Sequence, residues 1–106
     1  MTAALTDLAD LAARIGAVRR VAVLGDMLEL GEGSRDYHLA LGQRVQRAGV
    51  ELLVTVGPEA AAIAERVAGE TEILPTAEVA ARIVPGVLQP GDLVLDPFVG
   101  GGTTLV

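Results

Sequence analysis

The first fifteen residues carry apolar side chains at the spacing of an amphipathic helix. These side chains recur every three or four positions, so they gather along one side of a helix. The apolar set is Leu5, Leu8, Leu11, Ala12 and Ile15. The pattern predicts a helix over residues 3–15, which Thr2 can cap and Gly16 can end.

Four short apolar runs follow, at residues 19–26, 51–57, 71–74 and 92–96. They are rich in valine and leucine, and they are short for buried helices. Runs of this kind are typical of strands that are buried on both faces of a parallel sheet.

The segments between these runs predict three more helices. Ser34 is a suitable N-cap for the first of them, and Pro58 suits the first position of a second that runs to about Val67. Thr76 can cap a third over residues 77–84 or slightly beyond. The apolar face of the first would comprise Tyr37, Leu41, Val45 and Ala48.

Strands that alternate with helices at this spacing predict βαβ units. We therefore expect a three-layer, Rossmann-like α/β fold with a mostly parallel sheet and helices on both faces. Ligands of such sheets bind beyond the carboxyl ends of the strands. The strand ends of interest are Gly25-Asp26, Val56-Gly57 and Asp96 onward.

Composition narrows the chemistry that a chain of 106 residues can perform. All eight basic residues are arginine, so a P-loop lysine, a Schiff base and a lysine nucleophile are excluded within this sequence. The absence of cysteine excludes disulfides and thiolate metal sites. A net charge of −6 argues against a nucleic-acid partner, because phosphate contacts need clustered positive charge.

The sequence also predicts no membrane association. Its first residues, MTAALTDLADL, lack the basic region of a signal peptide, and no apolar run reaches the roughly 18 residues that a membrane helix needs. We expect a cytoplasmic protein.

Asp26, Glu29 and His38 are the polar candidates after the first strand. The two carboxylates could bind an ammonium group, orient an arginine, or hold a metal through water; alternatively, Asp26 caps a loop amide and Glu29 is solvated. His38 could hydrogen-bond near a substrate or support the preceding loop. One histidine without a second ligand makes a poor metal site, so we expect no metal here.

The remaining strand ends leave alternatives open too. Gly57-Pro58 could present backbone N–H groups to an anion, or form a simple tight turn. The tail, DPFVGGGTT, has glycines that let the backbone approach a ligand, or it is a loose terminus. We expect fraying beyond about Phe98, because terminal glycines have no side chains to pack.

The stretch AVLGDMLELG at residues 22–31, followed by His38, Gly42 and LLVTVG at 52–57, resembles the C-terminal domain of the Mur ligases of peptidoglycan synthesis. Within that family it is most similar to the ligases that add D-alanyl-D-alanine to UDP-N-acetylmuramoyl-tripeptide. The resemblance covers about residues 1–95, which we take as one domain, with 96–106 as an atypical Gly-rich tail.

The resemblance implies an ATP-dependent, amide-forming ligase in which an acyl phosphate is attacked by the amine of the dipeptide. In the family, a first domain binds the UDP-sugar and a central one carries the P-loop and Mg²⁺ sites. The C-terminal domain closes over the nucleotide and helps to position the dipeptide. By resemblance, Gly25, Asp26, Glu29, His38 and Gly57 face the nucleotide or substrate. We expect no catalytic residue and no activity from this chain alone, whose partners would be the other domains.

The sequence departs from the family at both ends. The Asn-Pro segment that normally precedes the first helix is missing, so we expect a truncated piece. Downstream, a Lys-Gly-Ser-Arg type loop is replaced by residues 96–104. That replacement resembles the S-adenosylmethionine-binding motif of DNA methyltransferases, which implies Asp96, Phe98, Gly100, Gly102 and Thr103 as alternative cofactor-binding residues. A structural module without a ligand is the third alternative.

Overall fold

The computed structural model describes residues 2–26, 33–96 and 102–106. Nine elements follow one another along these residues. They are α1 (Thr2–Ile15), β1 (Arg19–Gly25), α2 (Ser34–Arg47), β2 (Leu52–Val56), α3 (Ala61–Ala64), β3 (Glu70–Leu74), α4 (Ala77–Val87), β4 (Asp92–Asp96) and β5 (Gly102–Leu105).

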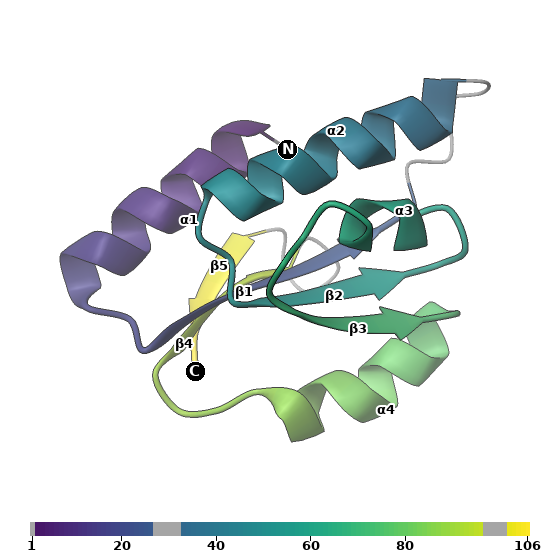
Figure 1. The fold of residues 1–106 in the computed structure, drawn as a ribbon. Coiled ribbons are helices and arrows are strands. Elements are labelled where there is room, and N and C mark those ends of the chain that lie inside the picture. Colours follow the sequence, from purple (N-terminus) through teal and green to yellow (C-terminus); the bar gives the residue numbers. More distant parts are fainter. Residues whose placement is uncertain (1, 27–32, 97–101) are drawn as a thin grey trace.

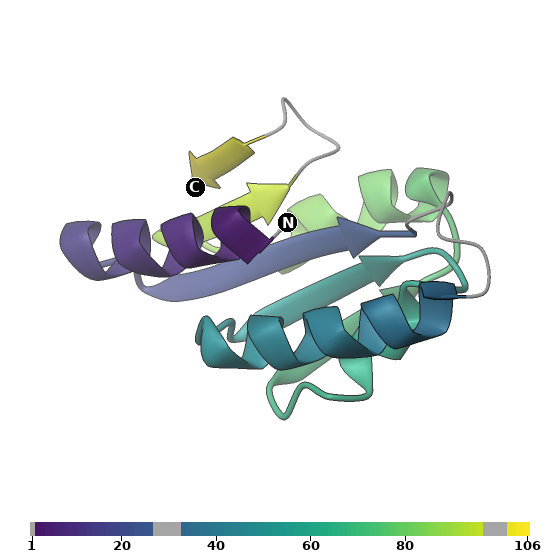
Figure 2. The same ribbon diagram turned by 90° about the horizontal axis from the view of Figure 1, so that it is seen from above.

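The strands form one sheet in the order β3-β2-β1-β4-β5. β1 to β4 are all parallel, and β5 is added antiparallel to β4. Helices α1, α2 and α3 lie on one face of the sheet and α4 on the other (Figure 1; Figure 2 shows the same layers from above). The predicted three-layer, Rossmann-like α/β fold is thereby confirmed.

The core has one part on each face of the sheet, because successive strand residues point to opposite sides. On β1, Ala22 and Leu24 face the α1–α3 side, while Val21 and Val23 face α4. Val21 lies in register with Leu52 on one side and Val94 on the other. The side chains are almost entirely aliphatic, as the near absence of aromatic residues requires.

One predicted helix differs from the observed one. The helix expected from Pro58 to Val67 is a single turn, Ala61–Ala64. Bonds to other elements hold the chain on both sides of this turn, since Asp26 binds the Ala60 N–H and the Gln46 side chain binds the Ala68 N–H. By contrast, α4 runs from Ala77 to Val87, as the prediction of a helix to 84 or slightly beyond allows.

The prediction that the chain frays beyond Phe98 is wrong for its last residues. Gly102–Leu105 form β5, and the register pairs Asp96 with Gly102 and Leu93 with Leu105. The Val106 N–H also donates to the Asp92 carbonyl at 2.8 Å. Backbone pairing with β4 therefore orders this stretch without help from large side chains.

Candidate functional site

The carboxyl ends of the parallel strands meet at one edge of the sheet. The chain moves outward from β1 to β2 and β3, and then returns to place β4 on the other side of β1. The winding direction reverses between β1 and β4, which is where ligands of open α/β sheets bind. We therefore take this edge as the candidate functional site.

Asp26 ties the end of β1 to the turn after β2. Its Oδ1 accepts a hydrogen bond from the Ala60 N–H at 2.6 Å. The carboxylate lies directly over the Cα of Gly57, where a Cβ would come within 2.6 Å of the Asp26 Cγ. Gly57 also has a φ of +108°, which L side chains rarely adopt. The predicted loop-capping role of Asp26 is thus the one that the geometry supports.

The turn at Gly57 is tight, and two N–H groups in it already have acceptors. The Gly57 N–H donates to the Leu74 carbonyl at 2.8 Å, and Pro58 has no N–H. The Ala60 N–H is the one bonded to Asp26. These three residues therefore favour the tight-turn interpretation over an anion site. Gly25 ends β1 beside them, whereas Glu29 lies outside the described residues.

His38 lies inside the protein. Its side chain is fully buried on α2, and the Tyr37 ring meets it edge-on with centroids 6.1 Å apart. The same helix packs closely on α3, since a Cβ at Gly42 would collide with the Ile63 carbonyl. The burial favours the structural interpretation of His38 over direct contact with a substrate.

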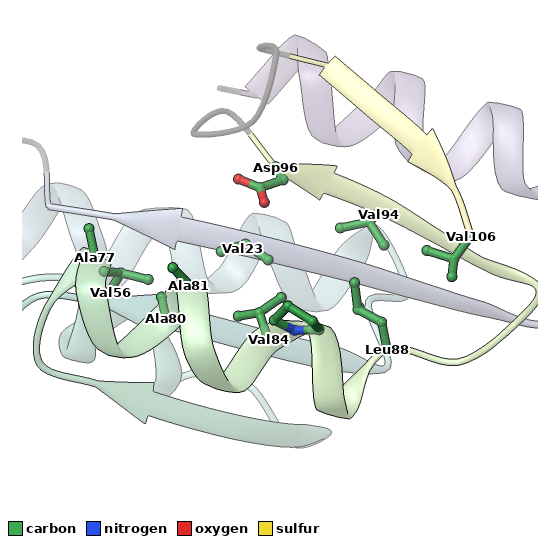
Figure 3. Close-up of a pocket in the computed structure, with 11 residues that line it drawn as sticks. Val23, Val56, Ala77, Ala80, Ala81, Val84, Leu88, Val94, Asp96 and Val106 are labelled. Carbon is green, nitrogen blue, oxygen red and sulfur yellow. The ribbon is translucent and has the colours of Figure 1, made fainter.

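A cavity of about 460 Å³ runs along α4 on the opposite face of the sheet (Figure 3). It forms because a helix about 10 Å wide covers only about two strands spaced 4.8 Å apart, whereas four parallel strands share this face. Its walls are aliphatic, and Asp96 is the only charged side chain among the described residues that line it. The cavity is bounded by Val23, Val56, Ala77, Ala80, Ala81, Val84, Pro85, Leu88, Val94, Asp96 and Val106.

The alternative cofactor-binding residues are not all placed. Asp96 ends β4 and lines the cavity, while Phe98 and Gly100 lie outside the described residues. Gly102 and Thr103 belong to β5, in register with Asp96 and Leu95. Their backbones therefore lie in a strand and not in a turn that opens onto a helix.

The best-defined ion pair lies at the other end of the sheet, and sequence reasoning missed it. Arg19 at the start of β1 binds the fully buried Asp92 at the start of β4, with Nε–Oδ1 at 3.0 Å and Nη2–Oδ2 at 2.7 Å. The Gln89 N–H donates to the same carboxylate at 2.9 Å. The hydrogen bonds from Arg19 hold the pKa of Asp92 below its ordinary value, although burial opposes this effect. Because the two residues are 73 positions apart, no local pattern could reveal them.

No group of three or more His, Asp or Glu side chains that could hold a metal ion gathers among the described residues. The sequence has no lysine. No helix in the described part of the chain is long and apolar enough to cross a membrane.

Comparison with protein-family models gives one match, to the Mur ligase, glutamate ligase domain, over residues 1–96. The match spans α1 to β4 and includes the Asp26 and Gly57 turns at the candidate site. The chain therefore belongs to the Mur ligase family of peptidoglycan synthesis, as a Mur ligase C-terminal domain.

Proposed function

We propose that this chain serves a ligase that uses ATP to join D-alanyl-D-alanine to UDP-N-acetylmuramoyl-tripeptide. Its family membership supports a ligase of peptidoglycan synthesis. The choice of acceptor rests on the long signature at residues 22–31, which is most similar to the D-alanyl-D-alanine-adding branch. Such a ligase consumes a nucleotide and a nucleotide-linked precursor, so we place it in the cytoplasm.

In this role the domain closes over the nucleotide and positions the incoming dipeptide. The observation that carries the proposal is that a hydrogen bond from another segment holds the end of β1 in place. The bond from Asp26 to Ala60 fixes two neighbouring strand ends relative to each other. Strand ends fixed in this way give the rest of the ligase a defined edge of the sheet to pack against. The ATP and Mg²⁺ chemistry belongs to the P-loop domain, which is the partner that the proposal requires.

A hybrid enzyme tests the proposal. The C-terminal domain of a D-alanyl-D-alanine-adding ligase is replaced by residues 1–96, and ADP release is measured with each acceptor. We expect turnover with D-alanyl-D-alanine and none with D-glutamate, which is tested because the matched family's description mentions glutamate. Turnover with D-glutamate alone would contradict the proposed acceptor, and a folded hybrid inactive with both would contradict the proposed role.

The position of Asp96 on the cavity favours S-adenosylmethionine binding as a second candidate function. Calorimetric titration with the cofactor tests it directly. Binding that Asp96→Ala abolishes would support this function, whereas no heat at millimolar cofactor would reject it. If the hybrid is inactive with both acceptors and the titration gives no heat, the structural module without a ligand is the better description.

A further inference from the structure

The two edges of the sheet differ in how they are protected from other strands. A strand at an edge leaves a row of backbone N–H and C=O groups unpaired, and natural proteins commonly block such edges with charged side chains. β3 forms one edge and carries Glu70 and Glu72. β5 forms the other, and the ten residues from Pro97 to Val106 include no charged side chain.

The pairing of β5 with β4 determines which backbone groups are free. In an antiparallel ladder, hydrogen-bonded and non-hydrogen-bonded positions alternate along each strand. The Val106 N–H donates to the Asp92 carbonyl, which assigns Gly102 and Thr104 to the bonded positions facing β4. Thr103 and Leu105 therefore direct their N–H and C=O groups away from β4, where the described residues offer no strand. Figure 2 shows β5 at the outer margin of the sheet.

The end of this edge is apolar as well as free of charged side chains. Leu105 is 59 % exposed and Val106 46 %. Two copies of a chain with net charge −6 repel each other over most of their surfaces, and this repulsion is weakest where no charged side chain is present. An edge that has no charged side chain and has free backbone groups fits a second identical edge.

We infer that β5 pairs antiparallel with β5 of a second copy of this chain, about a two-fold axis at Thr104. In this register Thr103 lies opposite Leu105 of the partner copy, and each such pair exchanges two N–H···O bonds. The contact is isologous, so it closes as a dimer and cannot extend into a filament. It is small compared with standard interfaces of about 1,200–2,000 Å², so the dimer is weak and depends on concentration.

Analytical ultracentrifugation of the full chain from about 10 μM to about 1 mM tests this inference, because a small interface gives a Kd in that range. We expect the weight-average mass to rise from 10.9 kDa towards twice that value. Thr103→Pro removes an outward N–H and leaves the β4 ladder intact, and Leu105→Lys adds charge at the edge. Each should weaken association at least tenfold.

Ile73→Lys is the matched control, since Ile73 is 57 % exposed on β3, the other edge strand. It should leave the mass profile unchanged, and circular dichroism should show that all three variants keep the native spectrum. A monomer throughout the range, growth beyond a dimer, or loss of association in Ile73→Lys alone would each overturn the inference. The test is independent of the proposed ligase function.

Discussion

The ion pair between Arg19 and Asp92 gives the sharpest prediction about stability. Asp92 is fully buried, and its carboxylate accepts three hydrogen bonds, two from Arg19 and one from the Gln89 N–H. Arg19 also donates to the Val87 carbonyl at 2.9 Å, and its side chain is 16 % exposed. The pair joins the starts of β1 and β4 to the end of α4. Asp92→Asn removes the negative charge and leaves a mostly buried guanidinium without its main partner.

The expected cost is about 3–5 kcal/mol, which is typical when one member of a buried ion pair is removed. A domain of this size has a free energy of unfolding of about 5–15 kcal/mol, so the variant should lose about a fifth or more of its stability. Replacing both members, as in Arg19→Met with Asp92→Leu, removes both buried charges together. The double variant should therefore recover much of the loss.

Urea unfolding followed by far-ultraviolet circular dichroism measures these differences, because the chain has no tryptophan for fluorescence. The exposed pair of Arg35 and Glu65, at 3.0 Å with side chains 65 % and 50 % exposed, supplies the control. Glu65→Gln should cost less than about 1 kcal/mol. A loss below about 1 kcal/mol in Asp92→Asn, or a double variant less stable than the single one, would refute the reasoning.

The pH dependence has a definite sign. The bonds from Arg19 lower the pKa of Asp92 in the folded chain relative to its ordinary 3.8. A carboxyl group with a lowered pKa adds stability that is complete above the unfolded pKa and is lost as the pH falls through the folded one. The difference between the natural chain and Asp92→Asn should therefore be constant above about pH 5 and shrink in more acidic solution.

Three further substitutions test the packing of the candidate site and the core, each by urea unfolding. Gly57→Ala forces a Cβ against the Asp26 carboxylate at a positive φ and should lower the free energy of unfolding by at least about 1–2 kcal/mol. Gly33→Ala is the control, because Gly33 has open space around it, and it should change the free energy of unfolding very little. Thr55→Val removes a buried hydroxyl that has no hydrogen-bond partner among the described residues and should gain about 1 kcal/mol; a loss would contradict this. Asp26→Ala leaves the Ala60 N–H without its acceptor and should cost about 1 kcal/mol, and an unchanged midpoint would show that the bond is dispensable.

The strands were predictable because their signal is local. Runs such as residues 52–56 are apolar at every position but Thr55, and all five side chains are buried between the two helix layers. The same reasoning found α1 and α2, whose apolar spacing fixes the face that packs on the sheet. The length of a run, its apolar periodicity and its capping residues suffice to predict an element when these local features alone determine its structure.

The rest could not be predicted because it depends on contacts between distant segments. The Pro58 pattern favours a long helix, but bonds from Asp26 and Gln46 confine the helix to one turn. The pairing of β5 depends on the free edge of β4, which no property of a Gly-rich tail reveals. Sequence reasoning located Asp26 and Gly57 at strand ends, but the contact between them appears only once β1 and β2 are placed side by side.

The two ends of the sheet have different physical roles. At the amino ends, the pair of Arg19 and Asp92 fixes β1 against β4 with buried charges, a rigid arrangement that is costly to disturb. At the carboxyl ends, the strands are held by single hydrogen bonds such as that from Ala60 to Asp26, which are weaker individually. The strong restraint between β1 and β4 therefore lies at the amino ends, and the bond between Asp26 and Ala60 adds a weaker one between the end of β1 and the turn after β2.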